Sequence, residues 1–333
     1  MKPQWKHRRE GGGRLALLLM IGVTRLCGRA VARALLYPVT LYFMLRRGDE
    51  RRDSRAYLQR VLGRPATWRD VWRHVHTFAA TILDRLFLLT ENTRRYAVRT
   101  QGLDALHGHL DAGKGVLLFG SHLGSFEVLR VLSQQRPNYA IRVVLDRAHG
   151  KALTELLEAI SPELAATVID AGQDGPSVAL AIKDALDTGA MVALLVDRAQ
   201  DGGATTSVPF LGAPAPFPTA PWQLASVLKV PVMLAFGLYR GGNRYDLLFE
   251  PFSDAIALPR GQRRAGVDAL IARYAARLEH HARSAPYNWF NFYDFWTPDP
   301  APGGDLPGAA SMPARPAADR LPGGADVGRD AGD

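Results

Sequence analysis

Short apolar runs alternate with helical stretches from residue 116 to residue 249, and this alternation constrains the fold more than any other feature of the chain. Runs of this length, bounded by glycine, proline or polar residues, are typical of buried strands. Strands that alternate with helices form parallel sheets covered by helices. The sequence therefore predicts an α/β fold with a central, mostly parallel sheet flanked by helices. A membrane-associated helix is expected at its N-terminus.

The individual elements are predicted from hydrophobic periodicity. Strands are expected at residues 116–119, 140–145, 167–169, 191–196, 232–238 and 245–249, the last two forming an antiparallel hairpin around Gly241-Gly242. Helices are expected at residues 56–62, 68–89, 125–134, 151–160, 177–188, 218–229 and 263–283. Thr67 is the expected cap of the second helix, with Asp70 in its first turn.

Composition divides the chain into three parts. Residues 1–48 are basic and apolar, residues 49–297 hold the predicted α/β domain, and residues 298–333 contain almost no large apolar side chain, so we expect them to be disordered. The single cysteine, Cys27, excludes an internal disulfide framework. The histidine pairs 74/76 and 280/281 lack cysteine or spaced acidic partners, so we expect them on helix surfaces and predict no metal site.

The positive charge of the chain is concentrated at its N-terminus. Residues 1–60 hold fourteen Lys and Arg against four acids, whereas the whole chain carries a net charge of +9. These charges flank two apolar stretches, and Arg25, Arg29 and Arg33 form one helical stripe. We predict a helix or a bent hairpin that lies in the interface of an anionic membrane or dips into its cytoplasmic leaflet, bent at Pro38, with arginines at the headgroups. The alternative is a long surface helix that packs on its own protein.

A histidine and a glutamate stand close together at the end of the first predicted parallel strand. The turn over Gly120 to Gly124 places His122 just beyond the carboxyl end of that strand, where open α/β sheets bind ligands. Because Gly124 turns the chain, Glu127 can reach back to one imidazole nitrogen and leave the other free to take a proton. We therefore predict His122 as a general base and Glu127 as its orienting partner.

A second predicted strand delivers Asp197 and Arg198 to the same edge of the sheet. Such a pair either closes a loop as a structural ion pair or orients a substrate. Further along, residues 287–296 are rich in aromatic side chains, which we expect to pack in the core rather than to line the membrane side.

These motifs resemble the lysophospholipid acyltransferase superfamily, and within it the lipid A late acyltransferase branch. The segment from His122 to Glu127 is similar to the His-x4-Asp/Glu motif of that family. Asp197 stands at the second strand end, and the turn Phe210-Leu211-Gly212 is followed by Ala215. The resemblance extends from the N-terminus to about Trp296.

The resemblance implies transfer of a fatty acyl group to a hydroxyl of a membrane glycolipid or phospholipid at the cytoplasmic face of a bacterial inner membrane. The implied donor is a thioester of acyl carrier protein or of coenzyme A, which is a co-substrate, and no cofactor is implied. His122 and Glu127 are the implied catalytic pair. The implied substrate-binding residues are Ser121, Gly124, Asp197, Arg198, Phe210 and Gly212.

In the mechanism we expect, His122 takes the proton of the acceptor hydroxyl, and backbone N–H groups near Gly124 stabilise the oxyanion. Two other functions use the same residues differently. A hydrolase would use the dyad to activate water on an acyl ester or thioester, and a non-catalytic membrane scaffold would not use it at all. A nucleic-acid binder is least expected, because aliphatic side chains interrupt the basic segment and exposed aromatics do not.

Overall fold

The computed structural model describes residues 14–89, 95–129, 139–147, 165–199 and 202–296. All of these residues belong to one compact unit, which spans Met1–Asp299. Its helices are α1 (Arg14–Arg46), α2 (Gly48–Leu62), α3 (Trp68–Leu88), α4 (Leu103–Asp111), α8 (Gly175–Asp187), α9 (Ala220–Leu228) and α10 (Arg263–Ser284), with the 3-10 helices η3 (Phe126–Leu129) and η4 (Arg260–Gln262). Its strands are β1 (Ala97–Gln101), β2 (Val116–Gly120), β3 (Ile141–Leu145), β4 (Val168–Asp170), β5 (Met191–Leu195), β6 (Thr205–Phe210), β7 (Ala213–Pro218), β8 (Val232–Tyr239) and β9 (Arg244–Ser253).

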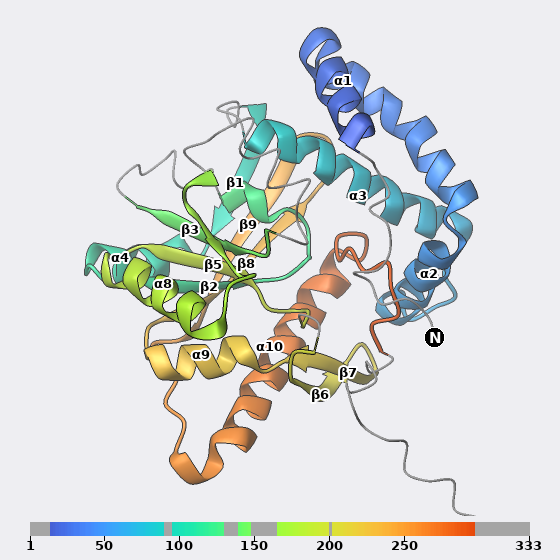
Figure 1. The fold of residues 1–333 in the computed structure, drawn as a ribbon. Coiled ribbons are helices and arrows are strands. Elements are labelled where there is room, and N and C mark those ends of the chain that lie inside the picture. Colours follow the sequence, from blue (N-terminus) through green and yellow to red (C-terminus); the bar gives the residue numbers. More distant parts are fainter. Residues whose placement is uncertain (1–13, 90–94, 130–138, 148–164, 200–201, 297–333) are drawn as a thin grey trace, which may run out of the picture. The chain divides into compact units, whose positions relative to one another are not determined.

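A seven-stranded sheet forms the centre of the unit, in the order β1-β9-β8-β2-β5-β3-β4 (Figure 1). Strands β8, β2, β5, β3 and β4 run parallel to one another. Strand β9 is antiparallel to β8 and parallel to β1. The prediction of an α/β fold around a mostly parallel sheet is therefore confirmed, including the hairpin around Gly241-Gly242.

Alternate residues of the central strands divide the core into two layers, because successive side chains of a strand point to opposite faces. Phe119 of β2 belongs to a cluster with residues of α2, α8, α9, α10 and the β6–β7 hairpin. Its neighbour Leu118 belongs to a second cluster, with residues of α1, α3, α4 and η3. Every residue of β2 is buried. Helices thus cover both faces of the sheet, and the strand that precedes the histidine motif lies at the centre of the core.

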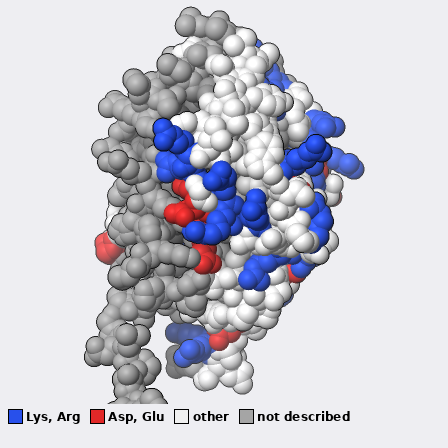
Figure 2. All heavy atoms as spheres, turned by 90° about the vertical axis from the view of Figure 1, so that its right-hand side faces the viewer, with Lys and Arg blue, Asp and Glu red and all other residues white. Residues whose placement is uncertain are grey.

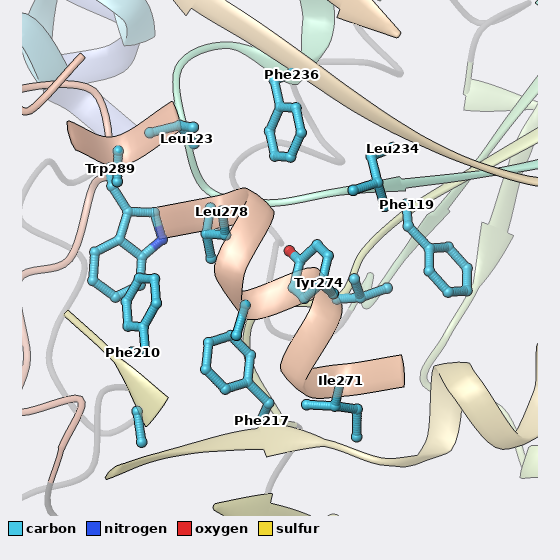
Figure 3. Packing of buried hydrophobic residues seen from close by; sticks show 14 of the residues in the cluster. Phe119, Leu123, Phe210, Phe217, Leu234, Phe236, Ile271, Tyr274, Leu278 and Trp289 are labelled. Atoms are coloured by element: carbon cyan, nitrogen blue, oxygen red, sulfur yellow. The ribbon is translucent and has the colours of Figure 1, made fainter. Parts of the chain in front are cut away.

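The aromatic segment near residue 290 packs in the first of these layers, as predicted. Trp289 is fully buried, and its ring centroid lies 5.2 Å from that of Phe210 and 4.9 Å from that of Phe295. Tyr274 and Leu278 project from α10 into the same cluster (Figure 3). Edge-to-face ring pairs contribute about 0.5–1.5 kcal/mol each beyond the area they bury. This packing fixes the indole of Trp289.

The sequence predictions miss strand β1 and the β6–β7 hairpin. Four prolines stand in the hairpin, and proline argues against a strand because it has no N–H to donate. The hairpin tolerates them because the two strands pair only with each other, so each strand has an outer edge without ladder bonds. The helix predicted at residues 125–134 is a 3-10 turn over Phe126–Leu129. Residues 130–134 and the predicted helix at 151–160 lie outside the described residues.

Helix α3 begins with the predicted cap. The Thr67 hydroxyl accepts the N–H of Asp70 at 3.2 Å, and the Asp70 carboxylate accepts the N–H of Thr67 at 2.8 Å, which together form a capping box. Hydrogen bonds from the Arg64 guanidinium and from Thr67 hold the pKa of Asp70 well below its ordinary value. The helix that carries His74 and Arg85 therefore starts from a fixed point.

Helix α1 is interrupted at a different residue from the one predicted. Gly28 has φ 78° and ψ 174°, which are not helical values, and it divides α1 into two helical segments. Glycine adopts positive φ without the steric cost that a Cβ imposes. Pro38, where the sequence predicts a bend, lies within the second segment. No helix among the described residues, which begin at Arg14, is both long enough and apolar enough to cross a membrane.

The arginine stripe of α1 faces the protein, which corrects the prediction that it lies at lipid headgroups. Arg29 donates to the buried carboxylate of Asp84 on α3 at 3.0 and 3.1 Å. Arg33 donates to the Tyr239 hydroxyl at 2.6 Å. The side chain of Arg25 lies outside the described residues. These bonds attach α1 to α3 and to the β8–β9 hairpin, and apolar side chains of the second segment such as Val31, Leu41 and Leu45 are exposed on another side of the helix.

Candidate active site

The register of two neighbouring strands brings His122 and Asp197 together. Strands β2 and β5 are parallel, and Gly120 pairs with Leu195 at their carboxyl ends. His122 lies two residues after Gly120, and Asp197 lies two residues after Leu195. The two side chains are therefore 75 residues apart in the sequence, as are the paired strand positions. The side chains therefore meet at the carboxyl edge of the sheet, where α/β sheets bind ligands.

The carboxylate of Asp197 orients the imidazole of His122. Nδ1 of His122 lies 2.8 Å from Oδ1 of Asp197, and the His122 backbone N–H donates to Oδ2 at 3.1 Å. The indole N–H of Trp289 also donates to Oδ2, at 3.0 Å. Asp197 is fully buried, yet its interactions with His122, together with the positive charge of Arg198, outweigh the burial and lower the pKa of this carboxyl. Asp197 is therefore ionised, and it can only accept hydrogen bonds.

Because Asp197 only accepts, Nδ1 of His122 carries the proton and Nε2 carries the lone pair. Within the described part of the chain Nε2 has no hydrogen-bonding partner, and the His122 side chain is 35% exposed. Burial and the charge of Arg198 lower the pKa of His122, against the opposing effect of Asp197. The imidazole is therefore neutral at pH 7 and presents a free basic nitrogen to a ligand, which is the arrangement of a general base.

Glu127 does not orient His122 in this structure, which corrects the predicted dyad. The carboxylate of Glu127 lies 2.5 Å from Nε of Arg85 on α3 and accepts a hydrogen bond from the Ser125 hydroxyl at 2.9 Å. The reason is local geometry. After Gly124 the chain continues into η3, which packs against α3, and Glu127 pairs there with an arginine instead of turning back to the imidazole.

The backbone N–H groups that were predicted to stabilise an oxyanion are already engaged. Gly124 donates to the carbonyl of Asn288 at 2.8 Å, and Ser125 donates to the carbonyl of Gly237 at 2.8 Å. A Cβ on Gly124 would lie 1.9 Å from the Gly237 carbonyl oxygen, and φ at Gly124 is 78°. Only glycine fits this close approach. Gly124 therefore fixes the loop that carries His122, and it does not offer a donor to a ligand.

Asp197 and Arg198 were predicted to bind substrate, and the structure gives them other contacts. Asp197 is the buried partner of His122. The Arg198 guanidinium donates to the Phe290 carbonyl at 2.6 Å, lies over the Tyr293 ring at 5.1 Å, and approaches Asp197 at 3.9 Å. Arg198 thus connects the site to the aromatic segment.

The remaining predicted substrate residues lie around this arrangement. Ser121 is buried between the end of β2 and His122. Phe210 is fully buried against Trp289, so its ring has no surface for a ligand. Leu211 and Gly212 both have positive φ and form the turn between β6 and β7. The hairpin turn thus supports the packing of Trp289 and does not contact His122.

Two residues of the site were not predicted. Trp289 was expected only to fill the core, but its indole N–H holds Asp197 and its carbonyl accepts from Nε2 of His74 at 2.9 Å. Arg85 had no assigned role and pairs with Glu127. The sequence signal for Trp289 is its place in the aromatic segment, but nothing in the sequence indicates its partner. For Arg85 the signal is weaker, since it is one of many arginines.

The histidine pairs that were predicted on helix surfaces are partly buried. His74 is fully buried and contacts the Ser54 hydroxyl through Nδ1 at 2.8 Å. His281 is also buried, with Nε2 at 2.7 Å from Glu250. Hydrophobic patterning places a histidine on a helix but does not show which face the helix buries. Among the described residues, no three His, Cys, Asp or Glu side chains are grouped as a metal site requires.

Comparison with known protein families matches residues 1–297 to the family of bacterial lipid A biosynthesis acyltransferases. No curated protein matches the chain. The matched range contains His122, Asp197, Glu127, Arg85 and Trp289, together with all the strands of the central sheet. The resemblance drawn from the sequence motifs is confirmed by this match.

Proposed function

We propose the reaction at this site from the premise that the chain belongs to the bacterial lipid A biosynthesis acyltransferase family and is an acyltransferase that acts on a lipid. The acceptor is a hydroxyl of a glycolipid or phospholipid, and the donor is an acyl thioester of acyl carrier protein or of coenzyme A. The observation that supports the proposal best is the partly exposed His122 side chain, whose Nε2 has no partner among the described residues while Nδ1 faces the buried, ionised Asp197.

His122 acts as the general base. Its Nε2 takes the proton of the acceptor hydroxyl while the hydroxyl oxygen attacks the thioester carbonyl. The imidazolium that forms is stabilised by the Asp197 carboxylate. When the tetrahedral intermediate collapses, the C–S bond breaks, the new ester C–O bond remains, and the proton passes from His122 to the departing thiolate. The bonds and protons balance without a covalent enzyme intermediate and without a metal.

The pairing with Asp197 prepares His122 for this role before substrate binds. The two N–H groups on Oδ2 leave Oδ1 as the acceptor for Nδ1, so the ring has one orientation and one tautomer. Preorganisation of this kind removes the cost of ordering the base during the reaction. General-base catalysis by a positioned side chain typically contributes about 10²- to 10⁴-fold in rate.

Acyl transfer is tested by product analysis. The purified protein is incubated with a labelled acyl thioester and a bacterial lipid extract, and the products are separated. Transfer gives labelled lipid that carries one added acyl group, and its mass identifies the acceptor. Labelled free acid with no acylated lipid would contradict the proposal and would assign the site to hydrolysis. His122→Ala is the matched inactive control, and comparison of acyl carrier protein with coenzyme A identifies the donor.

We also propose that α1 binds the surface of the membrane that holds the acceptor. Its second segment has an inverted amphipathic pattern, in which polar Arg29, Arg33 and Thr40 face the protein. Its solvent face carries large apolar side chains spaced as one helical stripe, which are Val31, Leu35, Leu41, Tyr42 and Leu45, 37–69% exposed. A soluble surface helix has the opposite pattern.

Positive charge accompanies this apolar face. Figure 2 shows Lys and Arg side chains gathered across the middle of the face that carries α1, α2 and the start of α3, below an area without charge. Exposed arginines in these elements are Arg46, Arg52, Arg55, Arg69 and Arg73. An apolar helical face beside basic side chains is the combination that binds anionic bilayers without crossing them.

Vesicle flotation tests this second proposal. The protein is expected to float with vesicles that contain anionic phospholipid and to bind zwitterionic vesicles more weakly. Leu45→Glu places a charge on the proposed lipid face and is expected to reduce binding by at least about tenfold. Leu180→Glu is the matched control, because Leu180 is 60% exposed on α8. Equal binding of both variants would contradict a role for α1.

A further inference from the structure

A second charged pair stands beside His122 and takes no part in orienting it. Arg85 of α3 and Glu127 of η3 form an ion pair, and the Ser125 hydroxyl holds the second oxygen of Glu127. Glu127 and Ser125 follow His122 in the same short segment of chain. The pair therefore ties an arginine of α3 to the loop that carries the base.

The guanidinium of Arg85 is held on one side only. Its closest contact to Glu127 is an ion-pair contact from Nε, which makes no hydrogen bond, and within the described residues neither terminal nitrogen has a hydrogen-bonding partner. The Arg85 side chain is 28% exposed, whereas Glu127 is 14% exposed. By contrast, the terminal nitrogen Nη2 of Arg198 is bonded to the Phe290 carbonyl, and that of Arg29 to Asp84. Arg85 thus presents an open pair of donors.

Arg85 is also near enough to His122 for its positive charge to lower the pKa of the imidazole. An arginine that only tied α3 to η3 would gain most from directing its paired terminal nitrogens at the carboxylate. Here Nε is the nitrogen closest to the carboxylate, without hydrogen-bond geometry, and no hydrogen bond within the described residues occupies the terminal nitrogens. Glu127 consequently fixes the direction of the guanidinium without occupying the donors that match a tetrahedral anion.

We infer that Arg85, directed by Glu127, binds a phosphoryl group of one of the two substrates beside His122. The inference rests on the proposed acyl transfer and adds an anion-binding residue to the same site. A phosphate oxygen pair accepts both terminal N–H groups of one guanidinium, which gives binding strength and a fixed orientation. Glu127 acts as a positioning residue, because it contacts Arg85 and not the substrate.

Two sources can supply this phosphoryl group. Acyl carrier protein and coenzyme A both present the thioester on a pantetheine arm that ends in a phosphate. Lipid acceptors of the phospholipid and lipid A classes carry phosphate on the headgroup. The chemistry that Arg85 recognises is the same in both cases, so the experiment has one arm for each source.

Equilibrium binding to the full-length protein in detergent micelles is measured with four probes. The donor probes are a thioether analogue of acyl-phosphopantetheine and the same analogue without phosphate. The acceptor probes are lipid A with its phosphates intact and lipid A dephosphorylated by phosphatase. For one of these pairs we expect the phosphate to tighten binding by about 10- to 100-fold in the unmodified protein. Arg85→Gln is expected to abolish that difference and to leave binding of the probes without phosphate unchanged.

The variants of the two partners separate binding from folding. Glu127→Gln is expected to weaken the phosphate effect less than Arg85→Gln does, and Arg85→Lys is expected to restore part of it. The double variant Arg85→Leu/Glu127→Leu removes both charges together, so no unpaired carboxylate is left to unfold the loop. Arg264→Gln is the matched control, since Arg264 is an exposed arginine at the start of α10.

The inference is overturned if phosphate has no effect on binding of either pair, or if Arg85→Gln changes binding with and without phosphate equally. Turnover measured in parallel keeps the proposed function separate. A protein that transfers no acyl group from any donor refutes the proposed reaction, while the binding result still decides the role of Arg85. A loss of kcat without any change in phosphate binding assigns Arg85 to the transition state and contradicts the inference.

Discussion

Two imidazoles are connected to Trp289 by hydrogen bonds, and the comparison between them shows how a buried structural histidine differs from the one proposed as the base. His122 is bound through Asp197 to the indole N–H of Trp289, and His74 is bound to the carbonyl of the same residue. His74 is fully buried and both of its nitrogens are hydrogen-bonded, to Trp289 and to Ser54. The His122 side chain is 35% exposed, with a carboxylate on one nitrogen and no partner among the described residues on the other. The same type of side chain therefore has a structural role at position 74 and the proposed catalytic role at position 122.

The largest expected effect separates the two partners of the sequence motif. In Asp197→Asn, the N–H groups of His122 and Trp289 hold the amide oxygen, so the amide NH₂ must face Nδ1. The imidazole then carries its proton on Nε2, so that nitrogen no longer has a lone pair with which to accept the proton of the acceptor hydroxyl. We expect kcat to fall on the order of 10³-fold. Glu127→Gln should leave the Nδ1–H tautomer of His122 intact. An equal loss of kcat in both variants would contradict the assignment of Asp197 as the partner of His122.

The two imidazoles should respond to truncation in opposite ways. His122→Ala is expected to lose acyl transfer on the order of 10³-fold with little change in thermal unfolding. His74→Ala removes a buried ring and leaves the Ser54 hydroxyl and the Trp289 carbonyl without partners. We expect the free energy of unfolding to fall by about 2–4 kcal/mol while folded protein keeps measurable activity. Denaturant unfolding and single-turnover transfer on the same preparations provide the comparison.

The pH dependence of the unfolding free energy also distinguishes His74 from His122. Burial lowers the pKa of His74 from 6.5 to about 4, so the folded protein disfavours the protonated ring. The stability contributed by neutral His74 is present above pH 6.5 and is lost as the pH falls from 6.5 toward 4. The slope of unfolding free energy against pH in this range should be smaller in His74→Ala. An unchanged slope would show that other groups cause it.

The pH dependence of activity should report the pKa of His122. His122 must be neutral to accept a proton, and burial together with Arg198 lowers its pKa. The acid limb of kcat/KM is therefore expected to have its midpoint below pH 6.5. Arg198→Gln removes a positive charge beside the ring and should move this midpoint to higher pH. A midpoint that moves to lower pH would contradict the electrostatic account.

The smallest effect is expected from a substitution at Trp289, which contacts His74 directly and His122 through Asp197. Trp289→Phe keeps an aromatic ring in the core but removes the indole donor to Asp197. One N–H remains on the same carboxylate oxygen, so we expect a loss of about 1–2 kcal/mol in stability. The corresponding loss in kcat should be about tenfold. Trp222→Phe is a suitable control, because Trp222 is also fully buried and its indole N–H has no hydrogen-bond partner within the described residues.

Much of the fold follows from the sequence because hydrophobic patterning acts locally. The runs that became β2, β5 and β8 are short and apolar, and the cap at Thr67 is encoded within four residues. The β6–β7 hairpin was missed because its prolines contradict the usual signal, although the same residues are compatible with a two-stranded ribbon. Patterning also indicated that α1 has an arginine stripe, but not that the stripe faces Asp84.

The site was predicted less completely, because its contacts are long-range. His122 was identified from its place after β2, and Glu127 was chosen as its partner because it is near in sequence. The actual partner is 75 residues away and is brought in by the pairing of β2 with β5. The sequence put Asp197 at the same sheet edge but could not show that the two strands are neighbours. Trp289, a further 92 residues from Asp197, depends on packing alone.

The most direct test of this account is the protonation of His122 itself. In protein labelled with ¹⁵N-histidine, the resonances of His122 are assigned by their loss in His122→Gln, and the ¹⁵N shifts show which nitrogen carries the proton. We predict the Nδ1–H tautomer at pH 7, retained in Glu127→Gln and converted to the Nε2–H tautomer in Asp197→Asn. An Nε2–H tautomer in the unmodified protein, or a change in Glu127→Gln and not in Asp197→Asn, would contradict the claim that Asp197 prepares His122 as the base.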